Sequence, residues 1–476
     1  MTSQVLGETT TYTYDTASRL LNASTPSGSG AHVNEWSWHP NNALARARTV
    51  FSSGGTDTEI ADYEYVYDNN RNIVTQAVSG TVGTYASNYE YSPAQQLTKW
   101  TYAPSPGTAK VTTYGYDRNN NRTSQKVDSG DPTIWDYRLD NSINFVNGPV
   151  SGDGDKRTYT YNDDGLLHTD GCVTNTYDAF DRVKQVTVDS TTTPCPAGED
   201  TTTSYTYDGL DRQRAITVTG SDEAGQNTTT KDVYDGLTTT VVGQYNAVNG
   251  AFTQPEVLYQ LDAGGNQYAY DQANASAGKA FLDTDGHGNV TAITTAPASG
   301  TGGTGVLGCG VVYDPYGNPY QPDSGGNGIC ANGSQKNTTG NAAWYRGLTR
   351  DGSTGTYQMG TRTYDPDTGA FTTPDSYRVA SPSTDLSVGT DPLTANTYTY
   401  VNGNPVNMID PMATRRRSLG QRRFSVRLEP ELEVVQLRRR REGSGRPQGT
   451  RRPRNRRTER RPVQDGEDHP RDYSDQ

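Results

Sequence analysis

The chain of 476 residues is short of the residues that usually fill a hydrophobic core. Hydrophobic residues make up only 31% of it, where an ordinary globular protein has nearer half, and its mean hydropathy is −0.84. This composition excludes one large aliphatic core. A fold must therefore bury something other than Leu, Ile and Val.

Long apolar runs and the usual catalytic motifs are also missing. No run of about 18 apolar residues occurs, so the sequence predicts no membrane-spanning helix. The first residues lack the basic and apolar segments of a signal peptide. Phosphate-binding and dinucleotide-binding fingerprints, a nucleophile-elbow motif and paired histidines at helical spacing are absent. We therefore expect no cofactor, no metal site and no ordinary metabolic enzyme.

Cysteine is scarce, but its placement is informative. The four cysteines form two local pairs, Cys172 with Cys195 and Cys309 with Cys330, which are 23 and 21 residues apart. Neither pair has the close spacing of a zinc site. Each flanks a stretch typical of two strands and a turn, so we predict two disulfides and an oxidising, extracellular setting. The alternative is four unpaired thiols.

Tyrosine, in contrast, is abundant, and its spacing repeats. A phrase of two Tyr at i and i+2 followed by Asp, or a close variant of it, recurs along the chain. Its copies start at Tyr12, Tyr65, Tyr114 and Tyr205, with looser copies at Tyr89, Tyr159, Thr176 and Tyr268. A polar turn and a β-branched run follow most copies.

Each copy predicts a β-hairpin. Tyr at i and i+2 lies on one face of a strand. Asp followed by Gly or Asn accepts a positive φ and closes a tight turn, and the β-branched residues form the return strand. Because a single hairpin is marginally stable in water, we expect the hairpins to stack and to bury one another's Tyr rings.

The phrase resembles the YD repeat of RHS proteins, bacterial wall-associated proteins and teneurins, and the resemblance covers about residues 10–411. Five segments resemble the RHS-associated core in the family's order: 282–293, 312–319, 345–347, 357–375 and 396–411. The resemblance implies an all-β fold, in which a spiralling antiparallel sheet of YD-repeat hairpins forms a partial shell and a C-terminal core plugs it. Proline in Asp-Pro and Asn-Pro pairs cannot donate to a central ladder, which also suits a plug.

We accordingly divide the chain into a YD-repeat array (1–270), an RHS-associated core (271–411) and an Arg-rich tail (412–476). Some RHS cores cut themselves at the end of this motif, and the resemblance places the groups for that reaction at Arg362, Asp375 and Asp410. Two close carboxylates can share a proton and activate water. The family's usual Gly-containing ending is missing after Pro411, so the alternative is that these residues hold turns and ion pairs.

The tail differs from everything before it. Residues 413–476 hold 19 Arg, no Lys and 10 Asp or Glu, so they carry +9 and the remainder of the chain carries −21. Three interpretations stay open: a tail read out of frame, a disordered basic tail, and a small effector in the slot where the family carries toxins. In each we expect disorder over most of it. Nucleic acid could be bound only through these Arg clusters.

Three functions follow as hypotheses. The first is a structural shell of a secreted or surface-displayed polymorphic toxin, with a C-terminal toxin cargo and a cognate immunity protein as partners. The second is a surface adhesion module that binds carbohydrate or partner cells. The third is a self-cleaving aspartyl protease core. In each case we expect a location outside a bacterial cell and a chain that is a fragment of a longer protein.

Overall fold

The computed structural model describes residues 2–5, 8–148, 155–189, 195, 200–219, 228–247, 255–262, 264–272, 279–295, 306–320, 343–352, 354–360, 362–375, 396–410 and 426–427. The chain divides into two units, 1–432 and 433–476, and all described residues belong to the first. Among them are β-strands and two short 3-10 helices, η3 (Tyr345–Gly347) and η6 (Val401–Gly403), but no α-helix. The predicted all-β class is confirmed. The predicted tail lies outside the described residues, apart from β34 (Val426–Arg427).

The first sheet has 14 antiparallel strands, each paired with the next along the chain. Its strands are β1 (Thr2–Val5), β2 (Glu8–Tyr14), β3 (Leu20–Ser27), β4 (Gly30–Trp38), β5 (Leu44–Ser53), β6 (Thr56–Tyr67), β7 (Ile73–Ser79), β8 (Tyr85–Tyr91), β9 (Leu97–Pro104), β10 (Lys110–Tyr116), β11 (Arg122–Val127), β12 (Thr133–Tyr137), β13 (Ile143–Asn147) and β14 (Lys156–Thr158).

The second sheet has 13 strands in the same simple order. Its strands are β15 (Thr160–Tyr161), β16 (Leu167–Thr169), β17 (Val173–Tyr177), β18 (Val183–Val188), β19 (Thr201–Tyr207), β20 (Gln213–Thr219), β21 (Thr228–Tyr234), β22 (Val241–Asn246), β23 (Pro255–Leu261), β24 (Gln267–Gln272), β25 (Lys279–Thr284), β26 (Val290–Thr295) and β27 (Val306–Gly310). We call the two sheets together the wall.

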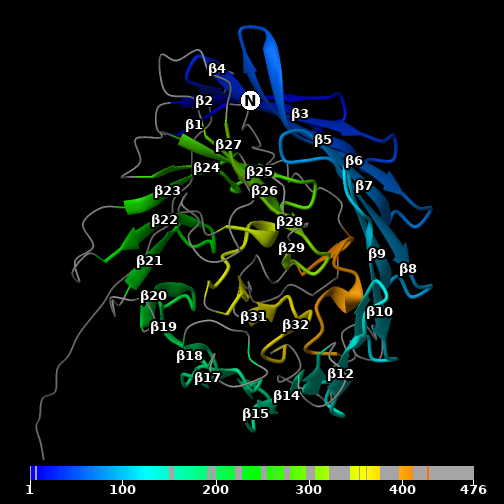
Figure 1. The fold of residues 1–476 in the computed structure, drawn as a ribbon. Helices are drawn as coiled ribbons and strands as arrows, with labels where there is room; N and C mark the ends of the chain where they lie inside the picture. The colour runs from blue at the N-terminus through cyan, green and yellow to red at the C-terminus, as the bar shows by residue number, and fades with distance from the viewer. Residues whose placement is uncertain are drawn as a thin grey trace, which may run out of the picture. The chain divides into compact units, whose positions relative to one another are not determined.

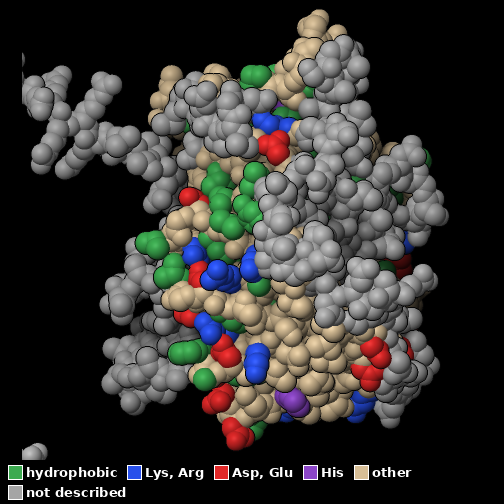
Figure 2. All heavy atoms as spheres, turned by 90° about the vertical axis from the view of Figure 1, so that its left-hand side faces the viewer, with side chains coloured by type: hydrophobic (Ala, Val, Ile, Leu, Met, Phe, Trp, Pro, Cys, Tyr) green, Lys and Arg blue, Asp and Glu red, His purple; other side chains and the backbone are tan. Residues whose placement is uncertain are grey.

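The wall is interrupted at one residue, Tyr159. β14 ends directly before it and pairs with β13, whereas β15 starts directly after it and pairs with β16. The extended segment 156–161 thus changes its partner strand at Tyr159. As a result the wall consists of two sheets, where the sequence predicts one continuous sheet. Figure 1 shows the strands following one another around the central elements. Uncharged polar side chains and backbone cover most of the described surface in Figure 2.

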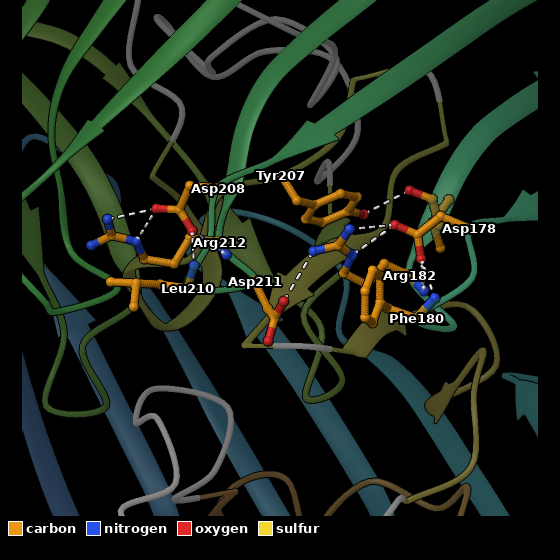
Figure 3. A network of polar contacts seen from close by, with 9 residues as sticks. Asp178, Phe180, Arg182, Tyr207, Asp208, Leu210, Asp211 and Arg212 are labelled. Carbon is orange, nitrogen blue, oxygen red and sulfur yellow. Dashed lines mark hydrogen bonds and ion pairs between the residues drawn. The ribbon is translucent and has the colours of Figure 1, made fainter. Parts of the chain in front are cut away.

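The turns of the wall repeat one geometry. Asp15 Oδ1 accepts the backbone N–H groups of Ala17 and Arg19 at 2.9 Å each, and Asp15 Oδ2 accepts Arg19 Nε at 2.6 Å. The same bonds recur after Asp178 and Asp208 (Figure 3).

The position of the positive φ corrects the sequence prediction. In most turns it falls three residues after the Asp, as at Ser18 with φ 64°, and directly beside the Asp only at Gly236 among the described Tyr-Asp turns. The reason is the length of the loop: a type I turn followed by one left-handed residue replaces the expected two-residue turn. The extra residue also shifts the strand register at the end of each hairpin, as between Val66 and Tyr67.

The hydroxyl of the Tyr before most of these turns donates a hydrogen bond to a backbone carbonyl of the preceding hairpin. Tyr67 Oη donates to the carbonyl oxygen of Leu44 at 2.8 Å, and Leu44 pairs with Trp38 at the bulge of the hairpin before. We call this series of bonds the tyrosine ladder. Its other members are Tyr91 on Ile73, Tyr116 on Leu97, Tyr137 on Arg122, Tyr177 on Leu167, Tyr207 on Val183, Tyr234 on Gln213 and Tyr313 on Val290. The repeated phrase therefore encodes the stacking of hairpins as well as each hairpin.

Short elements pack inside the wall (Figure 1). They are β28 (Val312–Tyr313), β29 (Pro319–Tyr320), β30 (Tyr357–Met359), β31 (Arg362–Asp365), β32 (Ala370–Phe371) and β33 (Met408–Ile409), and we call them, with η3, η6 and the described loops between them, the plug. β33 pairs with β34. One buried cluster joins plug residues such as Tyr357 and Tyr400 to the second sheet, and another joins Tyr316 and Val406 to the first. The core is thus a layer of rings between wall and plug.

The predicted boundary at residue 270, between the YD-repeat array and the RHS-associated core, was placed from sequence motifs, and it stays a prediction. The second sheet itself runs across this point, because β24 pairs with β25 and the sheet continues to Gly310.

Candidate functional site

The three residues predicted to take part in self-cleavage lie together in the plug. Arg362 begins β31, Asp375 follows β32, and Asp410 directly follows β33. One guanidinium nitrogen of Arg362, Nη2, lies 2.5 Å from Asp410 Oδ2, and the other, Nη1, lies 3.5 Å from Asp375 Oδ2. A single arginine therefore bridges two carboxylates that are 35 residues apart in the sequence.

The packing around Arg362 fixes this bridge. Its guanidinium carbon lies 3.5 Å from the centroid of the Phe371 ring, which covers one face of the charged group. The backbone N–H of Asp375 donates to the carbonyl oxygen of Thr397 at 3.0 Å. Burial lowers the pKa of Arg362, and the ion pair with Asp410 acts in the opposite direction.

The chemistry open to this cluster depends on the charge of the two carboxyl groups. Arg362 supplies one positive charge to two carboxylates, so the cluster keeps one net negative charge when both are ionised. A shared proton would give the acid and base pair that self-cleavage requires. Asp410 precedes Pro411, so this pair lies next to the predicted end of the core. The catalytic role of the three residues stays a prediction.

A second cluster, around Arg122, was not found from the sequence. The Arg122 guanidinium lies over the ring of Tyr316 at 4.3 Å and over that of Trp135 at 4.6 Å, and it donates to the carbonyl oxygen of Asp367. The hydroxyls of Tyr116 and Tyr316 form a hydrogen bond of 2.6 Å. These contacts attach the first sheet to the plug. The only sequence signal for this cluster was Tyr316 in the segment 313–318. Nothing in the sequence indicated that its ring packs against the first sheet.

A buried pair was also missed. His32 Nε2 lies 2.6 Å from Asp283 Oδ1, and both side chains are almost fully buried. Thr294 donates its hydroxyl to the other Asp283 oxygen, and His32 stacks on Phe281 with 4.1 Å between ring centroids. The pair connects β4 with β25, which are far apart in the sequence. It therefore ties the first strands of the wall to the last.

The cysteines follow the predicted pattern as far as the structure describes them. Cys172 and Cys195 form a disulfide with a Cα–Cα distance of 5.4 Å. Cys309 is disulfide-bonded too, whereas Cys330 lies outside the described residues.

Among the described residues, no group of His, Cys, Asp and Glu is arranged to hold a metal ion. No helix in the same part of the chain is long and apolar enough to cross a membrane.

Comparison with family models finds no match. Curated relatives are found, however. The chain is 27% identical over 292 residues to the tRNA nuclease WapA of Bacillus subtilis (strain 168), a match that covers 59% of this chain and 11% of that protein. It is 28% identical over 217 residues to the tRNA(Glu)-specific nuclease WapA of Bacillus subtilis subsp. natto, covering 44% and 8%. The chain thus matches about a tenth of the length of these relatives.

Solved structures share the fold. A complex of TcdB2 and TccC3 superposes with a TM-score of 0.61 at 17% identity, over 85% of this chain and 19% of that one. The Tc holotoxin pore of Photorhabdus luminescens gives a TM-score of 0.60 at 16% identity, over 90% and 21%.

Stacked Tyr-Asp hairpins around an internal plug define an all-β shell-type fold, and the solved structures share it. The repeated phrase, the order of the core motifs and the similarity to WapA take the identification one step further. The chain is an RHS/YD-repeat protein. Carbohydrate binding, the second hypothesis from the sequence, stays a prediction.

Proposed function

We propose that this chain is part of the wall and core of an RHS-type toxin, and that it encloses or presents a C-terminal effector polypeptide. The observation that carries the proposal is the position of the plug. It packs against both sheets through buried rings, and Asp410, near its end, is held by Arg362. A segment that follows Asp410 would start from a fixed point on the plug.

The proposal includes the domain division made above, with residues 412–476 in the position of the effector. The partners would be that effector and its cognate immunity protein. We also propose a location outside a bacterial cell. The Cys172–Cys195 disulfide supports this, because disulfides persist in oxidising compartments.

Trypsin digestion of the full chain tests enclosure, because residues 413–476 hold 19 Arg. If the wall encloses them, we expect the C-terminal end to survive in native buffer and to be digested once urea opens the wall. A matched variant, Leu237→Arg, adds a trypsin site at an exposed turn whose neighbouring sequence, residues 232–247, has no Lys or Arg, and it must be cut at once. Loss of the C-terminal end as fast as cleavage at this added site would refute enclosure.

The Arg362 cluster favours a second candidate function, self-processing of the core. It rests on the convergence of Asp375 and Asp410 on one arginine, close in sequence to the expected cut near residue 412. In this reaction one carboxylate would activate water and the other would donate a proton to the leaving nitrogen.

Mass spectrometry of the purified chain over time tests self-processing. We expect a fragment that ends near residue 412 and that Asp375→Asn abolishes. Asp367→Asn, which alters an exposed carboxylate of the same segment, serves as the control and should leave the fragment unchanged. A wild-type chain that stays intact would retire this candidate without affecting the enclosure proposal.

A further inference from the structure

The residue at the tip of each hairpin turn has a defined position in this fold. It is the second residue after the Asp, and in most turns its backbone N–H donates to Asp Oδ1, as from Phe180 to Asp178 and from Leu210 to Asp208 at 2.9 and 2.8 Å. The turn points this side chain away from the strands. The tip residue is thus the first part of a hairpin that another layer can meet.

One tip inside the molecule shows what such a residue does. Tyr316 occupies the same position after Asp314, and its N–H donates to Asp314 Oδ1 at 2.9 Å. Its side chain is almost fully buried, against the ring of Tyr114 at 5.4 Å and beneath the guanidinium of Arg122. A large tip residue therefore docks a hairpin against a second surface in this protein.

Three consecutive hairpins of the second sheet carry large tips without such a surface. Phe180 is 75% exposed, Leu237 is 77% exposed, and Leu210 between them is half-buried. We call these three residues the tip row. Figure 3 shows Phe180 and Leu210 on the same side of their two turns, with Asp211 between them. In the first sheet the corresponding tips are small or polar, for example Ala17, Asn70 and Asn119.

Beside the tip row, the arginines form ion pairs, whereas two of the aspartates do not form any among the described residues. The two arginines are occupied within the wall: Arg182 binds Asp178 and Asp211, and Arg212 binds Asp208 and two carbonyl oxygens of the next turn. In contrast, no ion pair among the described residues involves Asp164 or Asp181.

Those two free carboxylates border the row at one end. They line a groove of about 460 Å³ beside Phe180, together with Leu166 and Ala179. Exposed cations of the same hairpins, Lys184 and Arg214, follow in the strands beyond the turns. Among the described residues, the unpaired charge at the turn beside Phe180 is therefore negative, and a complementary partner at this end of the row would be basic.

The spacing of the row limits the shape of the partner. Neighbouring tips lie two strands apart, which corresponds to about 9.5 Å. Seven residues of an α-helix rise about 10.5 Å, so apolar side chains at every seventh position would meet successive tips. We propose that the tip row is a docking surface for a basic amphipathic α-helix of a partner protein. Its apolar face contacts Phe180, Leu210 and Leu237, and its Lys or Arg residues face Asp164 and Asp181.

Fluorescence anisotropy with the full chain tests this proposal. The probe is a labelled synthetic helix with Leu at every seventh position between Lys residues, and a scrambled peptide of the same composition is its control. We expect the triple variant Phe180→Ser, Leu210→Ser, Leu237→Ser to weaken binding of the probe at least about tenfold. Leu139→Ser, which alters an exposed apolar residue at a turn of the first sheet, should leave the dissociation constant unchanged.

A second set of variants tests the charges. Asp164→Asn with Asp181→Asn should weaken binding and reduce its dependence on salt. The thermal midpoint of the charge variant should match that of the wild type, because both aspartates are exposed. The midpoint of the triple variant should stay close to it, since of its three altered side chains only Leu210 is half-buried.

Three results would overturn the proposal. The first is equal binding of the probe to the wild type and to the triple variant. The second is equal binding of the scrambled peptide. The third is sedimentation of the wild type as a dimer that the triple variant abolishes, which would make a second copy of this chain the occupant.

Discussion

Removal of one hydroxyl from the tyrosine ladder should weaken the whole wall measurably. In Tyr67→Phe the ring stays, including its edge contact with His39, whose ring centroid lies 5.8 Å away. Only the hydrogen bond of 2.8 Å to the carbonyl oxygen of Leu44 is lost. Leu44 is buried, so water reaches its carbonyl poorly and the acceptor is left unsatisfied. Leaving such a group without a partner costs about 1–3 kcal/mol of unfolding free energy.

Urea unfolding of the full chain, followed by tryptophan fluorescence, measures this loss. Tyr14→Phe is the matched control, because its hydroxyl makes no hydrogen bond within the described residues and its side chain is 38% exposed. We expect the midpoint to fall for Tyr67→Phe and to stay unchanged for Tyr14→Phe.

A double variant tests whether the ladder acts as a set of separate bonds. Tyr177 lies in the second sheet and donates to Leu167 at 2.7 Å. Because the two sites share no partner, the losses for Tyr67→Phe and Tyr177→Phe should add. Midpoints equal to that of the wild type for both single variants would refute the claim that these hydroxyls hold the hairpins together.

Three further predictions concern pH and redox state. Burial raises the pKa of Asp232 to about 7, against a hydrogen bond from Gln244, so the folded chain keeps a proton that the unfolded chain loses above about pH 4. The free energy of unfolding should therefore fall as the pH rises from about 4 to 7. Asp232 should account for on the order of 4 kcal/mol of this decrease, so the decrease should be smaller by that amount in Asp232→Asn, as measured by denaturant unfolding at a series of pH values. Burial also raises the pKa of Tyr67 and Tyr102 to about 12, so phenolate absorbance in an alkaline titration should rise mainly in one step, together with unfolding. Cys172→Ser should lower the unfolding free energy by about 3 kcal/mol, and reductant should then have less effect on this variant than on the wild type.

The repeated phrase predicted the wall because its information is local. Two Tyr, an Asp and a β-branched run specify a strand, a turn and a return strand without any distant contact. The predicted position of the left-handed residue was wrong. Several residues other than Gly and Asn, among them Ser18, Arg71 and Asp181, adopt the positive φ that is expected mainly at Gly and Asn.

The acceptors of the tyrosine ladder could not be predicted. They are backbone carbonyls of the hairpin before, and a carbonyl leaves no mark in the sequence.

The clusters show the same limit at longer range. Arg362, Asp375 and Asp410 were predicted only because their motifs resemble a known core, and the structure then brought them within bonding distance. His32 and Asp283 had no such motif. They lie 251 residues apart, and only the stacking of the first strands on the last brings them together.

A crystal structure of the full chain tests the central claim most directly, since that claim is that Tyr-Asp hairpins surround a plug docked through Tyr316. We expect the Tyr316 hydroxyl bonded to that of Tyr116, the Arg122 guanidinium over the Tyr316 ring, and the Tyr67 hydroxyl on the Leu44 carbonyl. A structure in which residues 312–320 lie outside the two sheets, or in which these hydroxyls face solvent, would contradict the account.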